Sequence, residues 1–244
     1  MDRGSAHNGA GALASFPPGI GFSERAKSRT SDRWQLSAWA LWRPGMNGNA
    51  NAGTGRLGAS QVGLRLDREL LAGGLSGGRL TAYARLSRAL VHPASPEGAI
   101  GMAVQPVRAV PFTIGVERRI ALGAGGRDAM AIVSAAGIGP VTLPGRIALD
   151  GYAQAGMVGA RRRDAFGDGR LSLLRAVGNG RIALGLGLSG GAQPQVSRLD
   201  FGPEMRAKLG LAGGTVRLDA GWRARIAGNA RPGSGPAITL ASNF

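Results

Sequence analysis

The feature that most constrains this fold is an alternation of apolar and polar residues in long blocks. In "TVRLDAGWRARIAGN", the even-numbered positions from Val216 to Ile226 are apolar, whereas the odd-numbered positions from Arg217 to Arg225 carry Arg, Asp or Gly. Successive side chains of a β-strand point to opposite faces, so a period of two predicts a strand with one apolar and one polar face.

Blocks of this kind are separated by clusters of Gly, Pro, Asn and Asp, which favour turns. They span residues 33–43, 57–70, 79–90, 98–108, 110–122, 129–142, 145–159, 169–177, 181–192, 197–211, 215–228 and 235–244. Most reach or exceed the roughly 9–11 residues that a tilted strand needs to cross a bilayer. The sequence therefore predicts an all-β fold, an antiparallel transmembrane β-barrel of about 12 strands over residues 33–244, preceded by a disordered leader over residues 1–32.

The connections between blocks distinguish a barrel from a soluble sandwich, which would alternate in the same way. Outer-membrane barrels have short turns on the periplasmic side and longer loops outside. Alternate connections mostly follow this rule. One set includes "RAV", "LPG" and "VGNG" but also "AGGLSGG", and the other includes "RPGMNGNANAGTG", "VHPASPEG" and "GARRRDAFGDG" but also "GAQPQ". We expect the last strand to pair with the first, because closure leaves no edge strand. The terminal aromatic Phe244 is the predicted signal for the barrel-assembly machinery.

The chain is arginine-rich and strongly basic, with 30 Lys and Arg against 14 Asp and Glu and a formal net charge of +16. Such a charge suggests a polyanionic partner. Aromatic residues make up only 5%, and this disfavours nucleic acid as that partner, because base stacking needs aromatic side chains among the cations. The densest cluster is Arg161, Arg162 and Arg163, which we interpret as a solvated loop or as a contact with lipopolysaccharide phosphates or an acidic polysaccharide.

A set of charged residues falls on the polar face of the predicted strands and is expected to line the lumen. They are Arg65, Arg85, Glu117, Arg119, Arg146, Asp150, Arg217, Asp219, Arg223 and Arg225. Two interpretations stay open: a network of ion pairs that fills the lumen, and a cationic passage for an acidic solute. Acidic partners on these faces are fewer, chiefly Asp67, Glu117, Asp150 and Asp219, so the sequence predicts uncompensated positive charge and a preference for anions.

Motifs for catalysis or cofactor binding are weak. The chain has no cysteine and only two histidines, so thiolate metal sites are excluded. The stretch "GLGLSG" at residues 185–190 matches a dinucleotide-binding glycine pattern, but it lies inside an alternating block and predicts a strand. His92, Ser95 and Glu97 include the residue types of a hydrolase triad, yet three residues of one Pro-rich loop rarely converge in that geometry. We expect no enzymatic activity, no metal and no cofactor.

Several stretches resemble a known family of outer-membrane proteins. They are "GRIALDGYAQAGMVGARRRDAFGDG", "WRARIAGNARPGSGPAITLASNF", "GASQVGLRLDREL" and "RLTAYARLSRAL". They are similar to the C-terminal barrel of the family that includes bacteriophage adsorption protein A and bacterial cellulose synthase C, particularly sphingomonad members, without the helical repeats that precede the barrel there. The resemblance implies a porin-like barrel of a Gram-negative outer membrane, used for exopolysaccharide export or phage adsorption.

The resulting expectation is an outer-membrane barrel that contacts membrane lipid and lipopolysaccharide and passes or secretes a polysaccharide or another polar solute. No secretory signal is visible in residues 1–32, which lack a continuous apolar core. Two alternatives stay open. One is a structural or receptor barrel with a plugged lumen, and the other is a soluble, basic β protein that binds polyanions.

Overall fold

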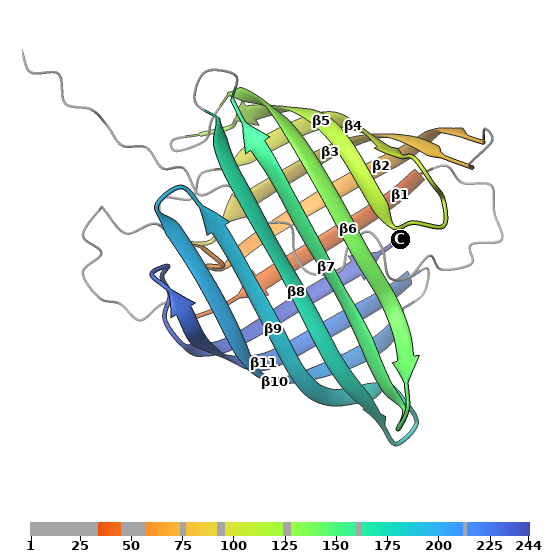
Figure 1. The fold of residues 1–244 in the computed structure, drawn as a ribbon, viewed down its shortest axis with the longest axis vertical. Coiled ribbons are helices and arrows are strands. Elements are labelled where there is room, and N and C mark those ends of the chain that lie inside the picture. The colour runs from red at the N-terminus through yellow and green to blue at the C-terminus, as the bar shows by residue number, and fades with distance from the viewer. Residues whose placement is uncertain are drawn as a thin grey trace, which may run out of the picture.

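The computed structural model describes residues 34–44, 57–73, 77–91, 96–123, 128–159, 163–211 and 214–244. Over these residues the chain forms twelve strands that close into one antiparallel barrel (Figure 1). The strands are β1 (Trp34–Trp42), β2 (Gln61–Ala72), β3 (Arg79–Ala89), β4 (Glu97–Gln105), β5 (Phe112–Ala121), β6 (Ala129–Leu143), β7 (Ile147–Val158), β8 (Asp164–Val177), β9 (Ile182–Gln193), β10 (Val196–Leu211), β11 (Gly214–Gly228) and β12 (Gly235–Asn243). The predicted fold class and the expected strand number are confirmed.

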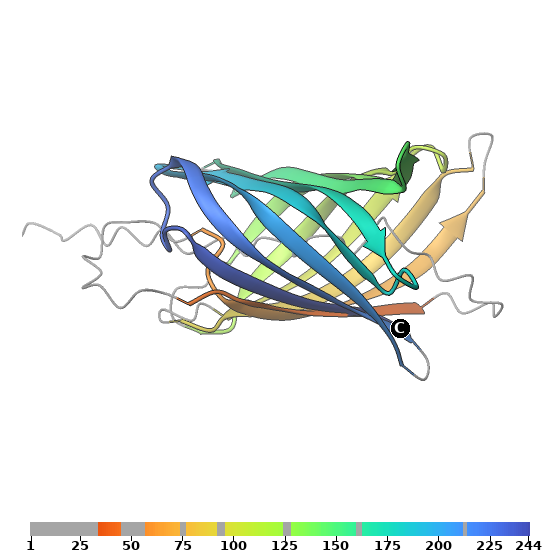
Figure 2. The same cartoon turned by 90° about the horizontal axis from the view of Figure 1, so that it is seen from below.

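The barrel closes where the first strand meets the last. Ala38 pairs with Ser242 and Ala40 with Leu240 in an antiparallel register. The Phe244 amide donates to the Leu36 carbonyl at 2.9 Å, which extends this pairing past the end of β12. Figures 1 and 2 both show the C-terminal end beside β1 and the strands steeply inclined across the wall. The expected pairing of the last strand with the first is confirmed, and it leaves neither strand with a free edge.

The alternation of the sequence becomes an apolar outer face and a polar interior. On β11, Trp222 and Ile226 are 51% and 59% exposed, whereas Asp219, of the opposite parity, is 3% exposed. On β5, Ile114 and Val116 are exposed and Glu117 is buried. Large apolar side chains thus cover the outside, and charged side chains fill the inside, because neighbouring residues of a strand point to opposite faces.

The connections define two ends of the barrel. One end carries the start of β1, Phe244 and the connections at residues 73–78, 106–111, 144–146, 178–181 and 212–213, and we call it the turn end. The other carries the connections at residues 43–60, 90–96, 122–128, 159–163, 194–195 and 229–234, and we call it the loop end. The loop end has most of the longer connections, as the sequence predicted.

Some predicted positions were wrong. Arg146 does not lie on a strand but in the exposed turn between β6 and β7, with a φ of 61° beside Gly145 at 79°. Pro144 and Gly145 start this turn, and Arg146, whose φ lies in the left-handed region, completes it. Strand β7 therefore begins at Ile147, two residues later than expected. Likewise, β8 begins at Asp164, which makes the preceding arginine-rich loop shorter than its sequence suggested.

Candidate functional site

The charged interior is the candidate functional site. Its side chains meet in three larger groups and in a smaller one, in which Tyr152 and Gln154 donate to Asp168. The mouth cluster comprises Arg43, Arg198 and Asp200 at the loop end. The β3–β5 cluster comprises Tyr83, Arg85, Glu97, Glu117 and Arg119. The β7–β11 cluster comprises Asp150, Arg170, Ser172, Glu204, Arg206, Arg217 and Asp219.

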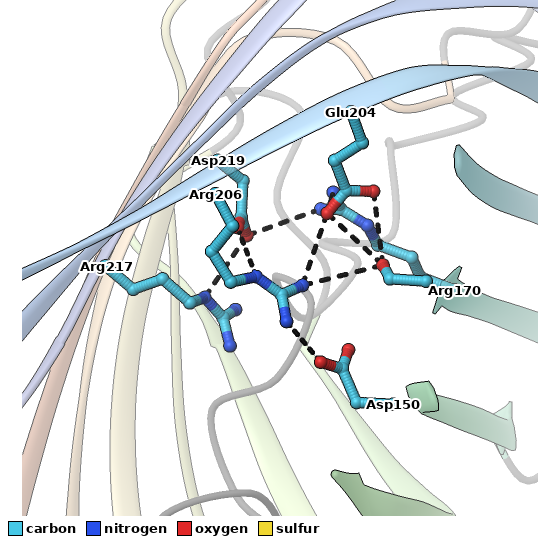
Figure 3. A network of polar contacts seen from close by, with 7 residues as sticks. Asp150, Arg170, Glu204, Arg206, Arg217 and Asp219 are labelled. Atoms are coloured by element: carbon cyan, nitrogen blue, oxygen red, sulfur yellow. Dashed lines mark hydrogen bonds and ion pairs between the residues drawn. The ribbon is translucent and has the colours of Figure 1, made fainter. Parts of the chain in front are cut away.

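Arg206 is the centre of the β7–β11 cluster, which Figure 3 shows in close view. Its guanidinium donates from Nε to Asp219 Oδ1 at 2.7 Å and also binds Asp150. Arg170 Nη2 lies 2.6 Å from Glu204 Oε1, and Arg217 Nε lies 3.2 Å from Asp219 Oδ2. Three arginines therefore face three carboxylates, and the cluster is electrically balanced.

Gly187 on β9 makes room for this cluster. A Cβ atom at this position would lie only 2.3 Å from Glu204 Oε2. Ser172 Oγ donates to the same carboxylate oxygen at 3.1 Å. The stretch that matches a dinucleotide-binding pattern is therefore part of a strand, as expected, and its glycine admits a charged neighbour.

The β3–β5 cluster is built around Glu117. This carboxylate accepts hydrogen bonds from Tyr83 Oη at 3.0 Å, Arg85 Nη2 at 2.8 Å and Arg119 Nε at 2.7 Å. Arg85 Nη2 also lies 2.8 Å from Glu97 Oε1. The Arg119 guanidinium carbon stands 5.2 Å from the centroid of the Phe166 ring, a cation–π contact. Two arginines and two carboxylates thus neutralise one another.

The mouth cluster ties two loop-end connections to β10. Arg43, just after β1, donates from Nη1 to Asp200 Oδ2 at 3.1 Å and from Nη2 to the Gly233 carbonyl at 2.7 Å. Arg198 donates from Nε to Asp200 Oδ2 at 2.7 Å and from Nη1 to the Leu57 carbonyl at 2.6 Å. Burial lowers the pKa of the Arg43 guanidinium, Arg198 lowers it further, and the hydrogen bond to Asp200 opposes both. These bonds hold chain segments inside the mouth.

The exposure of the interior charges falls from the turn end to the loop end. Toward the turn end, the side chains of Glu69 and Arg79 are 29% and 17% exposed, and that of Arg217 is 16% exposed. From the middle of the wall toward the loop end, those of Arg43, Glu117 and Arg119 are 0% exposed. A buried apolar group lies on the same end, made of Ala129, Ala131, Val133, Val158 and Phe166. In the part of the chain that the structure describes, the lumen admits water from the turn end and is closed toward the loop end.

The structure places most predicted lumen residues inside the barrel. Arg85, Glu117 and Arg119 meet in one cluster, Asp150, Arg217 and Asp219 meet in another, and Arg65 pairs with Asp67 at 2.8 Å. Arg225 lies at the loop-end rim, where it donates to the Ala230 carbonyl. Arg223 lines a small hollow beside Arg170 and has no ion pair among the described residues. Arg146, in its turn, is outside the lumen.

The other predicted residues lie elsewhere. Arg161 and Arg162 are outside the described residues, and Arg163 directly precedes β8. Phe244 is 54% exposed beside β1, and its role in assembly stays a prediction. Glu97 begins β4 and pairs with Arg85, while His92 and Ser95 fall outside the described residues.

The sequence interpretation missed several lumen residues. They are Arg43, Glu97, Asp168, Arg170, Arg198, Asp200, Glu204 and Arg206. A signal was present in β10, "VSRLDFGPEMRAKLGL", where the even positions from Arg198 to Lys208 are charged except for Gly202. The missed carboxylates of Glu97, Asp200 and Glu204 pair with arginines, so more of the positive charge in the lumen is compensated than the sequence interpretation expected.

The described residues show neither a group of metal ligands nor a membrane-spanning helix. Within them, no three His, Asp or Glu side chains are grouped to hold a metal ion. The described segments also contain no helix that is long and apolar enough to span a membrane.

Comparison with solved structures identifies the architecture. An outer membrane channel from Pseudomonas putida F1 aligns over 94% of this chain and 99% of that chain, with 11% identity and a TM-score of 0.51. LpxR from Salmonella typhimurium aligns over 86% and 99%, with 10% identity and a TM-score of 0.40. The β-domain of the Bordetella autotransporter BrkA aligns over 86% and 97%, with 14% identity and a TM-score of 0.34.

No protein-family model matches the chain, and no curated protein matches its sequence. At 11% identity, the likeness to the Pseudomonas channel concerns the fold alone. This chain has the fold of an outer-membrane β-barrel.

Proposed function

We propose that this protein spans the outer membrane and passes a polar solute through its lumen, with the loop-end clusters closing the passage at rest. The apolar outer face supports the membrane location, because large side chains such as Ile100, Leu186 and Trp222 stand exposed around the wall. A soluble protein rarely exposes so extensive an apolar surface. We propose no enzymatic role.

The observation that carries this proposal is the gradient of exposure among paired interior charges. A charged, water-accessible interior at the turn end resembles the polar lumen of transmembrane barrels. The mouth cluster and the β3–β5 cluster lie between this region and the loop end. Passage therefore requires the segments held by Arg43 and Arg198 to move away from Asp200.

The solute that fits best is polar and rich in hydrogen-bonding groups. The interior presents guanidinium groups, which bind carboxylates and phosphates in bidentate fashion. An acidic polysaccharide has such groups, and the resemblance to polysaccharide-exporting barrels favours export of an exopolysaccharide. Lipopolysaccharide at the outer surface, with Arg163 and its neighbours as contacts, and the barrel-assembly machinery are the proposed partners.

A second candidate function is a receptor or structural barrel with a permanently plugged lumen, used for surface docking. The complete burial of Arg43, Glu117 and Arg119 favours it. Such a barrel needs no moving mouth, because buried ion pairs resist separation.

Planar-bilayer recording of the purified protein tests both candidates. Asp200→Asn removes the carboxylate shared by Arg43 and Arg198, so we expect the open fraction to rise about tenfold over the parent protein. Asp67→Asn, in the partly exposed Arg65–Asp67 pair away from the mouth cluster, is the matched control and should leave the open fraction unchanged. Insertion without conductance in the parent and in Asp200→Asn would refute passage and favour the plugged barrel.

A further inference from the structure

The outer face carries a groove that crosses the seam between the first and last strands. Its floor is formed by Ala38 and Ala40 on β1, and its walls include Leu240 on β12, Leu64 on β2 and Leu86 on β3. Ala38 pairs with Leu64, and Ala40 pairs with Leu240, so small side chains lie between larger ones. The depression therefore follows from the register across the seam.

The groove has the size and chemistry of a site for a single apolar chain. Its volume is about 460 Å³, within the roughly 300–1,000 Å³ of typical ligand sites. Most side chains that line it are aliphatic. An alkyl chain fits such a lining, because its contacts need no hydrogen-bonding partners.

Arg88 stands where this groove approaches the loop end. It lies near the end of β3, shares the outward parity of Leu86, is exposed, and makes no ion pair with any described residue. The longer connections lie at this end, which places it on the external side of the membrane in the proposed orientation. A cation is thus located where lipid head groups of the outer leaflet would lie.

The charges of the outer face indicate the kind of occupant. In the described strands, no Asp or Glu has the outward parity, whereas Arg68, Arg88, Arg118 and Arg175 do. A second copy of this barrel would bring Arg88 against a face without carboxylates. An anionic lipid supplies the missing negative charge, and phosphate is a strong partner for guanidinium.

We propose that the groove binds one acyl chain of lipopolysaccharide in the outer leaflet, with Arg88 on a lipid A phosphate. This inference rests on the proposed membrane location. It goes beyond solute passage, because the site lies on the outer wall and involves none of the lumen clusters.

The test uses the full chain in nanodiscs of phosphatidylcholine with bisphosphorylated lipid A, followed by native mass spectrometry of the released barrel. The parent protein is expected to retain lipid A. Filling the floor with Ala38→Leu and Ala40→Leu should lower retention about fivefold or more, because the added side chains occupy the space of the acyl chain. The matched control fills the outward face of β7 with Ala153→Leu and Ala155→Leu and should retain lipid A as the parent does.

A separate variant tests the proposed contact between Arg88 and the phosphate of the lipid head group. Arg88→Gln should lower the preference for bisphosphorylated over dephosphorylated lipid A about fivefold, since a charge-assisted bond to phosphate is lost. Arg175→Gln, outward near the turn end of β8, is the control and should leave that preference unchanged. Equal retention of lipid A by the filled-floor variant and the parent would overturn the proposal. It would also be overturned if the β7 control lost as much lipid A as the filled-floor variant, or if Arg175→Gln lost as much of the phosphate preference as Arg88→Gln.

Two further results are informative. A dimer of the parent that disappears in the filled-floor variant would assign the groove to a second copy and overturn the lipid site. Flotation with vesicles tests the membrane location separately. Failure of the parent to insert would refute the proposed function and this inference together, whereas insertion with unchanged lipid A retention in the filled-floor variant would refute the inference alone.

Discussion

Replacing Glu117 by Gln should destabilise the barrel more than any comparable change in the exposed ion pairs of its lumen. Glu117 accepts hydrogen bonds from Tyr83, Arg85 and Arg119, and its side chain is 0% exposed. The glutamine would keep the shape of the side chain but lose its charge. Among carboxylates, Arg119 would then keep only a 3.9 Å contact with Glu97, while Arg85 would keep a 2.8 Å contact with the same group.

The magnitude follows from this loss of partners. Removing one member of a buried ion pair typically costs about 3–5 kcal/mol, because the remaining charge stays buried without compensation. Glu97 still compensates Arg85, so we expect a cost near the lower limit, about 3 kcal/mol. The Arg65–Asp67 pair is partly exposed, and Asp67→Asn should cost about 1 kcal/mol or less, as is usual for solvated pairs.

Equilibrium unfolding in urea measures this difference in detergent-refolded protein. With a denaturant dependence of about 2–3 kcal/mol per molar urea, Glu117→Gln should lower the midpoint by roughly 1 M or more. Asp67→Asn should lower it by less than about half a molar. If the two variants unfold at the same midpoint, the closed end of the lumen contains enough water to solvate both arginines, and the argument from burial is refuted.

Three other predictions concern the wall, the last strand and the lumen. Gly63→Val should cost about 1–3 kcal/mol in urea unfolding, because a Cβ at Gly63 would lie 2.2 Å from Trp39 Cζ2; an unchanged midpoint would mean that the ring moves away freely. Deleting Phe244 should lower the yield of folded barrel in the outer membrane more than Asn243→Ala does, and equal yields would remove its role as an assembly signal. Arg223→Gln should lower the anion preference of a conducting form about twofold in reversal-potential measurements without shifting the urea midpoint, since Arg223 has no ion pair among the described residues; a strong destabilisation would contradict that interpretation.

The alternation of apolar and polar residues along the sequence is enough to predict the two faces of the barrel wall. Parity along a strand is a local property, so the sequence placed Asp219 and Arg223 inside and Trp222 outside. The same reasoning applied to β10 would have found Asp200 and Glu204. It could not place Arg146, because the length of a hairpin turn depends on backbone angles that the Pro-Gly signal does not specify.

Only the tertiary structure decided which inward side chains meet and where the lumen closes. Arg43 and Asp200 are 157 positions apart and come together because closure leaves only two strands, β12 and β11, between β1 and β10. At the mouth, the backbone carbonyls of Leu57 and Gly233 accept hydrogen bonds from Arg198 and Arg43. The residue types at these two positions do not predict such contacts. The outer groove depends in the same way on the register of Ala40 against Leu240. Alternation acts between neighbours in sequence, whereas closure and register act between residues that are distant in sequence.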